Sequence, residues 1–217
     1  MEAEAYIGFI TGDIIKSRSA KHSNDWLESL KQILCEYGTC PQTLDIYMGD
    51  SFQLKIKEVE DALSVALLLK SGIKSIPKID VRMAVGIGKG HYNMPPHITE
   101  DNSEAAVNSG LRFDKLKAEK ITLAVNTPWK ELNRQFDILI YFAGLVINGW
   151  TTATATAIYH HLRHPDQTQH AITQAIGITQ PAISQAQKRG HLAAIIKLNT
   201  HYKSVIKQKL YPYVKHH

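Results

Sequence analysis

Residues 169–190, near the C-terminus, constrain the fold of this chain most strongly, because their spacing predicts a helix–turn–helix unit. Ile172 and Ile176 lie four residues apart and so share one face of a first helix. Gly177 then supplies a sharp turn, where a residue at positive φ is expected. Thr179 is placed to cap a second helix. An ordinary pair of packed helices would satisfy the same spacing and is the alternative interpretation.

The second helix of this unit is expected to be polar on its outer side. Pro181 fits its first turn, where the missing N–H costs little, and Ile183 and Ala186 point back toward the first helix. The other side chains are of types that hydrogen-bond base edges and phosphates, which predicts contact with double-stranded DNA. The predicted DNA-binding residues are Gln180, Ser184, Gln185, Gln187, Lys188 and Arg189.

Charge is distributed unevenly along the chain. Residues 127–217 carry ten Lys and Arg side chains against three acidic ones, a net charge of +7, so residues 1–126 carry −2 of the chain's +5. A basic part attached to a mildly acidic part indicates that only the C-terminal part meets a polyanion. A solvated basic tail would give the same count.

Residues 1–126 alternate between strand and helix patterns, in the order β-α-β-β-α-β-α-β, which is close to the split βαβ, ferredoxin-like pattern. We therefore expect the α+β class: a ferredoxin-like sheet with helices on one face, followed by an all-α helix–turn–helix domain. The predicted strands cover residues 5–12, 44–48, 52–57, 79–88 and 121–125, and the predicted helices begin near Ser23 and cover residues 58–71 and 102–117.

We divide the chain into an α+β domain (1–126), a connecting helix (127–149) and a helix–turn–helix domain (150–217). The connecting helix is rich in Leu, Ile and Phe, so it could also be a dimer surface. No apolar run approaches the roughly 20 residues needed to cross a bilayer. The acidic start, MEAEAY, differs from the basic start of a signal peptide. We expect a cytoplasmic protein that does not enter a membrane.

Two Gly-Asp pairs mark turns of the predicted sheet. Asp13 follows the first strand, and Asp50 lies at the tip of the hairpin formed by the next two strands. Because the first strand and the hairpin are neighbours in a split βαβ sheet, both carboxylates could converge at one edge. Paired Asp oxygens suit Mg²⁺ or Mn²⁺, which can hold a nucleotide triphosphate. Most Gly-Asp dipeptides, however, are simply turns.

Asn108 and Arg112 lie at i and i+4 of a predicted helix and therefore share one face. An amide and a guanidinium placed in this way could hold a ribose and a transition-state phosphate. The same segment is equally consistent with an ordinary helix that buries Val107 and Leu111 and leaves Arg112 in solvent.

Four segments of the N-terminal part are, in chain order, GDII (12–15), GDSFQ (49–53), VRMAVGIG (81–88) and SGLRFDKL (109–116). Together they resemble the SatD family and, more distantly, class III nucleotide cyclases. The similarity covers residues 6–125 and implies a nucleotide-cyclase-like domain. SatD-like proteins similarly tend to carry a C-terminal helix–turn–helix, which agrees with the pattern found above.

The cyclase resemblance implies roles for individual residues. Asp13 and Asp50 would bind the metal, and Asn108 and Arg112 would assist the transition state. Because such sites form between two protomers, the resemblance also implies a homodimer. The predicted nucleotide-binding residues are Asp101, seven residues before Asn108, and Lys16 and Arg18, which could touch phosphates or could simply be exposed turn residues.

These observations lead to two functional hypotheses. The first is a DNA-binding transcriptional regulator whose cyclase-like domain binds a nucleotide or related ligand. The second is an active Mg²⁺-dependent nucleotidyl cyclase or nucleotidyltransferase that is targeted or regulated by its helix–turn–helix. An interaction scaffold in which both sites are vestigial is a third, simpler interpretation.

Overall fold

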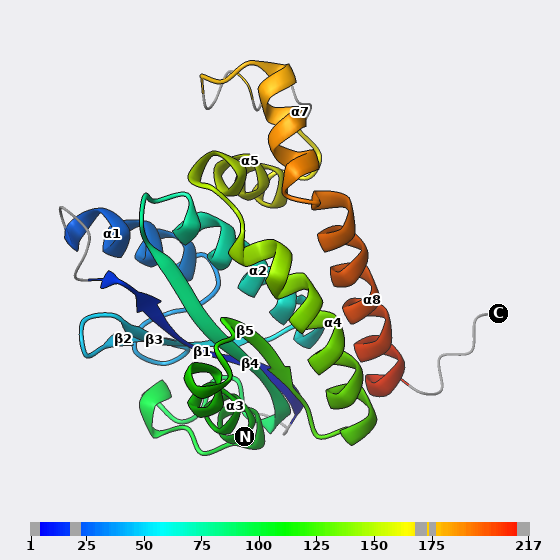
Figure 1. Cartoon of the computed structure of the whole chain (residues 1–217). Coiled ribbons are helices and arrows are strands. Elements are labelled where there is room, and N and C mark those ends of the chain that lie inside the picture. The colour runs from blue at the N-terminus through cyan, green and yellow to red at the C-terminus, as the bar shows by residue number, and fades with distance from the viewer. Residues whose placement is uncertain (1–4, 18–22, 168–172, 174–176, 212–217) are drawn as a thin grey trace.

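A computed structural model describes residues 5–17, 23–167, 173 and 177–211 of the chain (Figure 1). Five strands form one sheet in the order β2-β3-β1-β4-β5. Neighbouring strands are antiparallel from β2 to β4, and β5 is parallel to β4. The chain is therefore α+β, as predicted. The strands are β1 (Ala5–Ile15), β2 (Leu44–Tyr47), β3 (Ser51–Ile56), β4 (Asp80–Gly90) and β5 (Leu123–Asn126).

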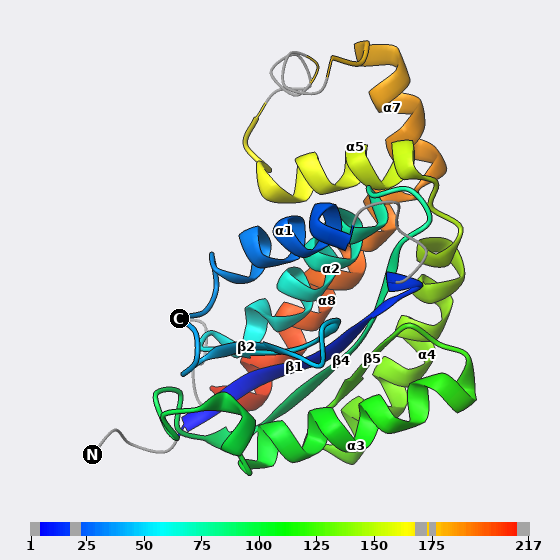
Figure 2. The ribbon, with the colours of Figure 1, turned by 90° about the vertical axis from the view of Figure 1, so that its left-hand side faces the viewer.

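Helices cover both faces of this sheet, which corrects the expectation that they lie on one face (Figure 2). The helices α1 (Ser23–Leu34) and α2 (Ala62–Lys74) pack on the face that carries the large hydrophobic core. The helix α3 (Glu104–Glu119) covers the opposite face, where smaller apolar clusters lie beneath it. Two short 3₁₀ turns, η2 (Val59–Asp61) and η3 (Ile98–Glu100), complete this part of the fold.

The close approach of α3 to the sheet depends on small residues in β4. Val85 and Ile87 point into the large core, so the glycines between and beside them face α3. A Cβ atom at Gly86 would lie only 2.2 Å from the carbonyl oxygen of Ala105 in α3. A Cβ atom at Gly88 would lie 2.5 Å from the backbone nitrogen of Ala105. Only glycine therefore lets the two backbones approach this closely.

The C-terminal helices pack on the α+β part of the chain. The helices α4 (Lys130–Asn148) and α5 (Thr152–Arg163) contact β5 and α2 respectively, and α8 (Leu192–Leu210) runs beside η2 and α2 (Figure 1). The helix α7 (Gln180–Arg189) rests on α5. The large core runs through all three predicted parts of the chain, because residues of α2, α4, α5 and α8 belong to it. In the described part of the chain, no helix is both long and apolar enough to cross a membrane.

Candidate functional site

The helix α7 is anchored by the apolar residues that its spacing predicted. Ile183 and Ala186 are buried and form a small cluster with Ala157 of α5. Before the helix, Gly177 adopts φ +66° and its N–H donates to the carbonyl of Thr173 at 2.9 Å, so the predicted turn is confirmed. Ile172 and Ile176, the predicted inner residues of the first helix, lie outside the described residues.

The start of α7 differs in one detail from the prediction. Thr179 occupies the N-cap position with extended backbone angles, but its side chain makes no capping hydrogen bond. Pro181 lies in the first turn, where its missing N–H leaves no helical partner unsatisfied. The helix start is therefore set by Pro181 and the turn rather than by the Thr179 hydroxyl.

The outer face of α7 is polar and basic. Of the predicted DNA-binding residues, four are exposed and two are half-buried. Beside them lies a groove of about 650 Å³ lined by residues of α5, α7 and α8, in which Lys197 adds further positive charge. The exposed residues are Gln180, Gln185, Lys188 and Arg189, the half-buried ones are Ser184 and Gln187, and the groove includes His161, His191 and Lys197.

The end of α7 is fixed by contacts that the sequence did not indicate. The indole N–H of Trp150 donates to the carbonyl oxygen of Gly190 at 3.0 Å, in a buried position. Gly190 also packs tightly on α5, because a Cβ there would lie 2.5 Å from the side chain of Ile158 and 2.7 Å from that of Thr154. The orientation of α7 is therefore set by its contacts with α5 and with Trp150, which lies just before α5.

The two Gly-Asp pairs meet at one end of the sheet, as the hairpin geometry predicted. Asp13 on β1 lies opposite Ser51 on β3, directly after Asp50. The N–H of Ile14 donates to the carbonyl of Asp50 at 2.9 Å. At the hairpin tip, Gly49 has φ +87°, a conformation in which a side chain would be strained.

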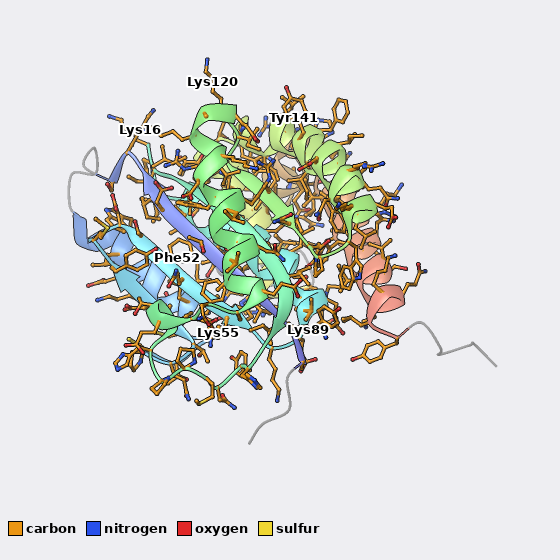
Figure 3. The ribbon with its side chains drawn as sticks, turned by 90° about the horizontal axis from the view of Figure 1, so that it is seen from below. Lys16, Phe52, Lys55, Lys89, Lys120 and Tyr141 are labelled. Atoms are coloured by element: carbon orange, nitrogen blue, oxygen red, sulfur yellow. The ribbon has the colours of Figure 1, made fainter. Side chains whose placement is uncertain are left out.

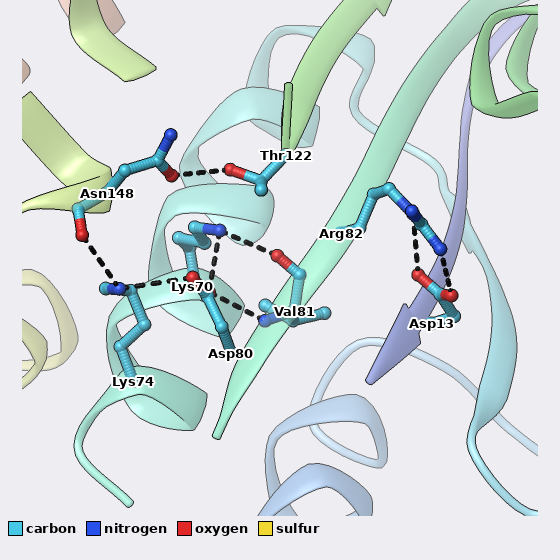
Figure 4. Close-up of polar contacts among 8 residues, drawn as sticks. All are labelled: Asp13, Lys70, Lys74, Asp80, Val81, Arg82, Thr122 and Asn148. Atoms are coloured by element: carbon cyan, nitrogen blue, oxygen red, sulfur yellow. Dashed lines mark hydrogen bonds and ion pairs between the residues drawn. The ribbon is translucent and has the colours of Figure 1, made fainter. Parts of the chain in front are cut away.

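Both carboxylates at this end already have protein partners. Asp13 accepts two hydrogen bonds from Arg82 of β4, at 3.0 and 2.5 Å (Figure 4), and Asp50 accepts one from the Ser17 hydroxyl at 2.8 Å. Arg82 also lies 5.7 Å from the centre of the Phe113 ring. A metal ion at Asp13 would have to displace the guanidinium, which pairs with both carboxylate oxygens in this arrangement. Within the described ranges, no group of three or more His, Cys, Asp or Glu side chains could hold a metal ion.

Asn108 and Arg112 share the flank of α3 that faces β5 and α4. The amide of Asn108 donates to the carbonyl of Ile87 at 2.7 Å. Arg112 pairs with Glu119 at 2.7 Å and with Asp137 of α4 at 3.3 Å, and it lines a cavity of about 280 Å³. Both side chains therefore have structural partners, and Arg112 is partly neutralised by two acids.

Asp101 belongs to a different region from Asp13. Its carboxylate lies 2.6 Å from the ammonium group of Lys55, and both side chains are almost fully buried, at 2% and 0% exposure. Lys55, labelled in Figure 3, also donates to the carbonyl of Met94, and that bond measures 2.6 Å between nitrogen and oxygen. The backbone of Lys55 lies opposite Phe9, four residues and therefore about 13 Å before Asp13 along β1, so Asp101 is paired at a different place along the sheet from Asp13.

The remaining predicted nucleotide-binding residues lie at the end of β1. Lys16 is exposed at φ +63°, as Figure 3 shows at the edge of the molecule. Arg18 lies outside the described residues. A cavity of about 860 Å³ lies instead beside Asp101 and the start of α3, where Lys89, His91 and Ser103 line it.

Comparison with known proteins adds no family: no protein-family model matches the chain, and no curated protein is significantly similar to it. The resemblance to the SatD family therefore stays a prediction based on motifs.

Proposed function

We propose that this protein is a DNA-binding transcriptional regulator that acts as a homodimer and reads double-stranded DNA with α7. The observation that carries the proposal is the division of α7 into two faces. Ile183 and Ala186 hold one face on α5, while Gln185, Lys188 and Arg189 are exposed on the other. A positioned helix with amide and basic side chains outward is what insertion into a major groove requires.

The architecture of the α+β part supports a sensory, ligand-binding role for that part of the chain. The order β2-β3-β1-β4, with α1 and α2 on one face, favours the ferredoxin-like and cyclase-like assignment. The motifs that resemble the SatD family lie within it. We propose that this part binds a nucleotide or a related ligand, with the cavity beside Lys89 and Asp101 as the candidate pocket.

The regulator proposal is tested by selecting bound duplexes from a random-sequence pool and then titrating salt on one selected duplex. Gln185→Ala is expected to relax preference at one base pair by about 1–3 kcal/mol. Lys188→Ala and Arg189→Ala should weaken binding to all duplexes and reduce the salt slope by about 0.9 for each lost phosphate contact. Lys117→Ala, on the exposed side of α3, is the matched control and should leave the sequence preference and the salt slope of binding unchanged. Unchanged binding by all three α7 variants would exclude this helix as the reader.

A second candidate function is Mg²⁺- or Mn²⁺-dependent nucleotidyl cyclase or nucleotidyltransferase activity. The convergence of Asp13 and Asp50 at one end of the sheet favours it, although Arg82 would have to release Asp13. The test incubates the full chain with each nucleoside triphosphate and either metal, and identifies products by mass spectrometry. A cyclic or linked nucleotide made by the natural chain and not by Asp13→Asn or Asp50→Asn would support it. No product from any nucleotide would contradict it.

A further inference from the structure

The helix α4 has two apolar faces, and within the described part of the chain only one of them is covered. Four of its apolar side chains are buried against the rest of the molecule. Four others, which recur at i, i+3, i+4 and i+7, are 52–62% exposed and form the outer stripe of α4. An exposed apolar stripe of this length indicates an interaction site. The buried set is Leu132, Phe136, Ile140 and Ile147, and the outer stripe is Ile138, Tyr141, Phe142 and Leu145.

A groove runs beside the outer stripe, between α4 and α8. Its volume is about 410 Å³, and most of its lining is apolar. Phe142 belongs to both the stripe and the groove, so a ridge and a hollow lie next to each other on one surface. Figure 3 shows Tyr141 on the outer side of α4, turned away from the sheet. The groove is lined by Leu139, Phe142, Ala143 and Val146 of α4 and by Ala194, Ile195 and Leu198 of α8, with Lys197 and His201 of α8 as its polar members.

The spacing of the stripe is the same when read in either direction. Ile138 and Leu145 lie at equal distances before and after the midpoint between Tyr141 and Phe142. Two copies of α4 packed antiparallel, with a two-fold axis at this midpoint, therefore place Ile138 of each copy against Leu145 of the other. A two-fold interface needs such a self-complementary patch, in which the same surface meets itself.

We infer that the outer stripe of α4 is the dimer interface of this protein, and that its occupant is a second copy of the chain, packed antiparallel. The adjacent ridge and groove support this choice, because each copy offers the ridge that the groove of the other can receive. The stripe also ends in polar residues on both sides: Arg134 lies one turn before Ile138, and Asn148 lies just beyond Leu145. A buried apolar centre with a polar rim is the usual organisation of such an interface.

This inference rests on the homodimeric regulator proposed above and specifies how its two copies meet. The same two-fold axis would relate the two α7 helices, as a palindromic DNA site requires. The two grooves share Ala194 and Lys197 of α8, but the residues of the outer stripe all lie on α4, so they can be substituted without changing the DNA-reading helix.

The test measures the mass of the full chain in solution by sedimentation equilibrium. The natural chain should be a dimer. Ile138→Glu and Leu145→Lys should each raise the dimer dissociation constant by roughly tenfold or more, because each places two unpaired charges in an apolar interface. The doubly substituted chain, Ile138→Glu with Leu145→Lys, should recover dimerisation, because the antiparallel register sets a carboxylate opposite an ammonium at both ends. Met48→Glu is the matched control: Met48 is 89% exposed on the hairpin at the opposite edge of the sheet.

A monomeric natural chain, or single variants that keep the natural mass, would overturn the interface. Single variants that dissociate without recovery in the double variant would overturn the antiparallel register. Circular dichroism of each variant separates dissociation from unfolding, and the exposed positions of Ile138 and Leu145 favour a retained fold. If the natural chain is a monomer whose DNA binding still depends on Lys188 and Arg189, the proposed interface is wrong and the proposed regulator function stands. If the chain is a stable dimer that binds no DNA, the regulator function is wrong and the interface stands.

Discussion

At the scale of single residues, one acid is shared by two lysines at the start of β4. Asp80 at the start of β4 lies 2.7 Å from Lys70, which is fully buried, and 3.1 Å from Lys74 (Figure 4). Lys70 also donates to the carbonyl of Val81, and Lys74 to that of Asn148 at the end of α4. These contacts join α2, β4 and α4. Burial lowers the pKa of Lys70 to about 8, although the neighbouring Asp80 opposes this shift.

This cluster predicts how stability depends on pH. Burial alone would raise the pKa of Asp80, but the two lysines and a backbone N–H outweigh it and lower that pKa. Because the folded-state pKa lies below the unfolded value of about 3.9, the stabilisation is complete above that value. It is lost as the pH falls through the lower, folded-state pKa. Chemical denaturation between pH 7 and pH 2 measures this loss.

Asp80→Asn should lower the free energy of unfolding at pH 7 by about 3–5 kcal/mol, because Lys70 keeps its burial and loses its partner. It should also flatten the acid-dependent loss. Asp61→Asn is the matched control, since Asp61 pairs with Lys203 at 2.7 Å but both side chains are only half-buried, at 46% and 37% exposure. That change should cost no more than about 1 kcal/mol. Equal losses in the two variants would contradict the role of the buried cluster.

At the scale of elements, periodicity was sufficient to locate the strands and helices but not to place them on the sheet. The predicted strand 79–88 is observed as Asp80–Gly90, and the predicted helix 102–117 as Glu104–Glu119. Hydrophobic spacing shows that α3 has an apolar face, but it does not indicate on which face of the sheet α3 packs. The signal for a covered second face was in β4, where Gly86 and Gly88 alternate with apolar residues.

The candidate sites were predictable to a similar degree. The split βαβ pattern brought Asp13 and Asp50 to one end of the sheet correctly, because it places the hairpin beside β1. Arg82 was missed, since its pairing with Asp13 depends on the register between β1 and β4, which are far apart in sequence. The position of Asp101 next to Lys55 was missed for the same reason: a loop of the chain folds back onto β3.

At the scale of the whole molecule, the C-terminal helices and the sheet share one core. Tyr202 of α8 is fully buried, its ring lies 5.4 Å from that of Phe136 in α4, and its hydroxyl donates to the carbonyl of Val59 at 3.0 Å. Burial, with nearby Glu60 and Asp61 adding to it, raises the pKa of this hydroxyl above its ordinary value, so it stays a hydrogen-bond donor. The predicted DNA-binding part is thus coupled in stability to the predicted ligand-binding part.

Because this core is continuous, we expect the chain to unfold in a single cooperative transition. Tyr202→Ala should lower the free energy of unfolding by about 3–5 kcal/mol, and the loss should reach the sheet as well as α8. Hydrogen exchange measured on peptides from β1 and from α8 checks this, because both should lose protection together. Tyr211→Ala is the matched control, since Tyr211 follows α8 and is 57% exposed. If β1 kept its protection while α8 lost it, the two parts would be independent folding units. Binding of a ligand to the sheet could then not change the stability of α7 through this shared core.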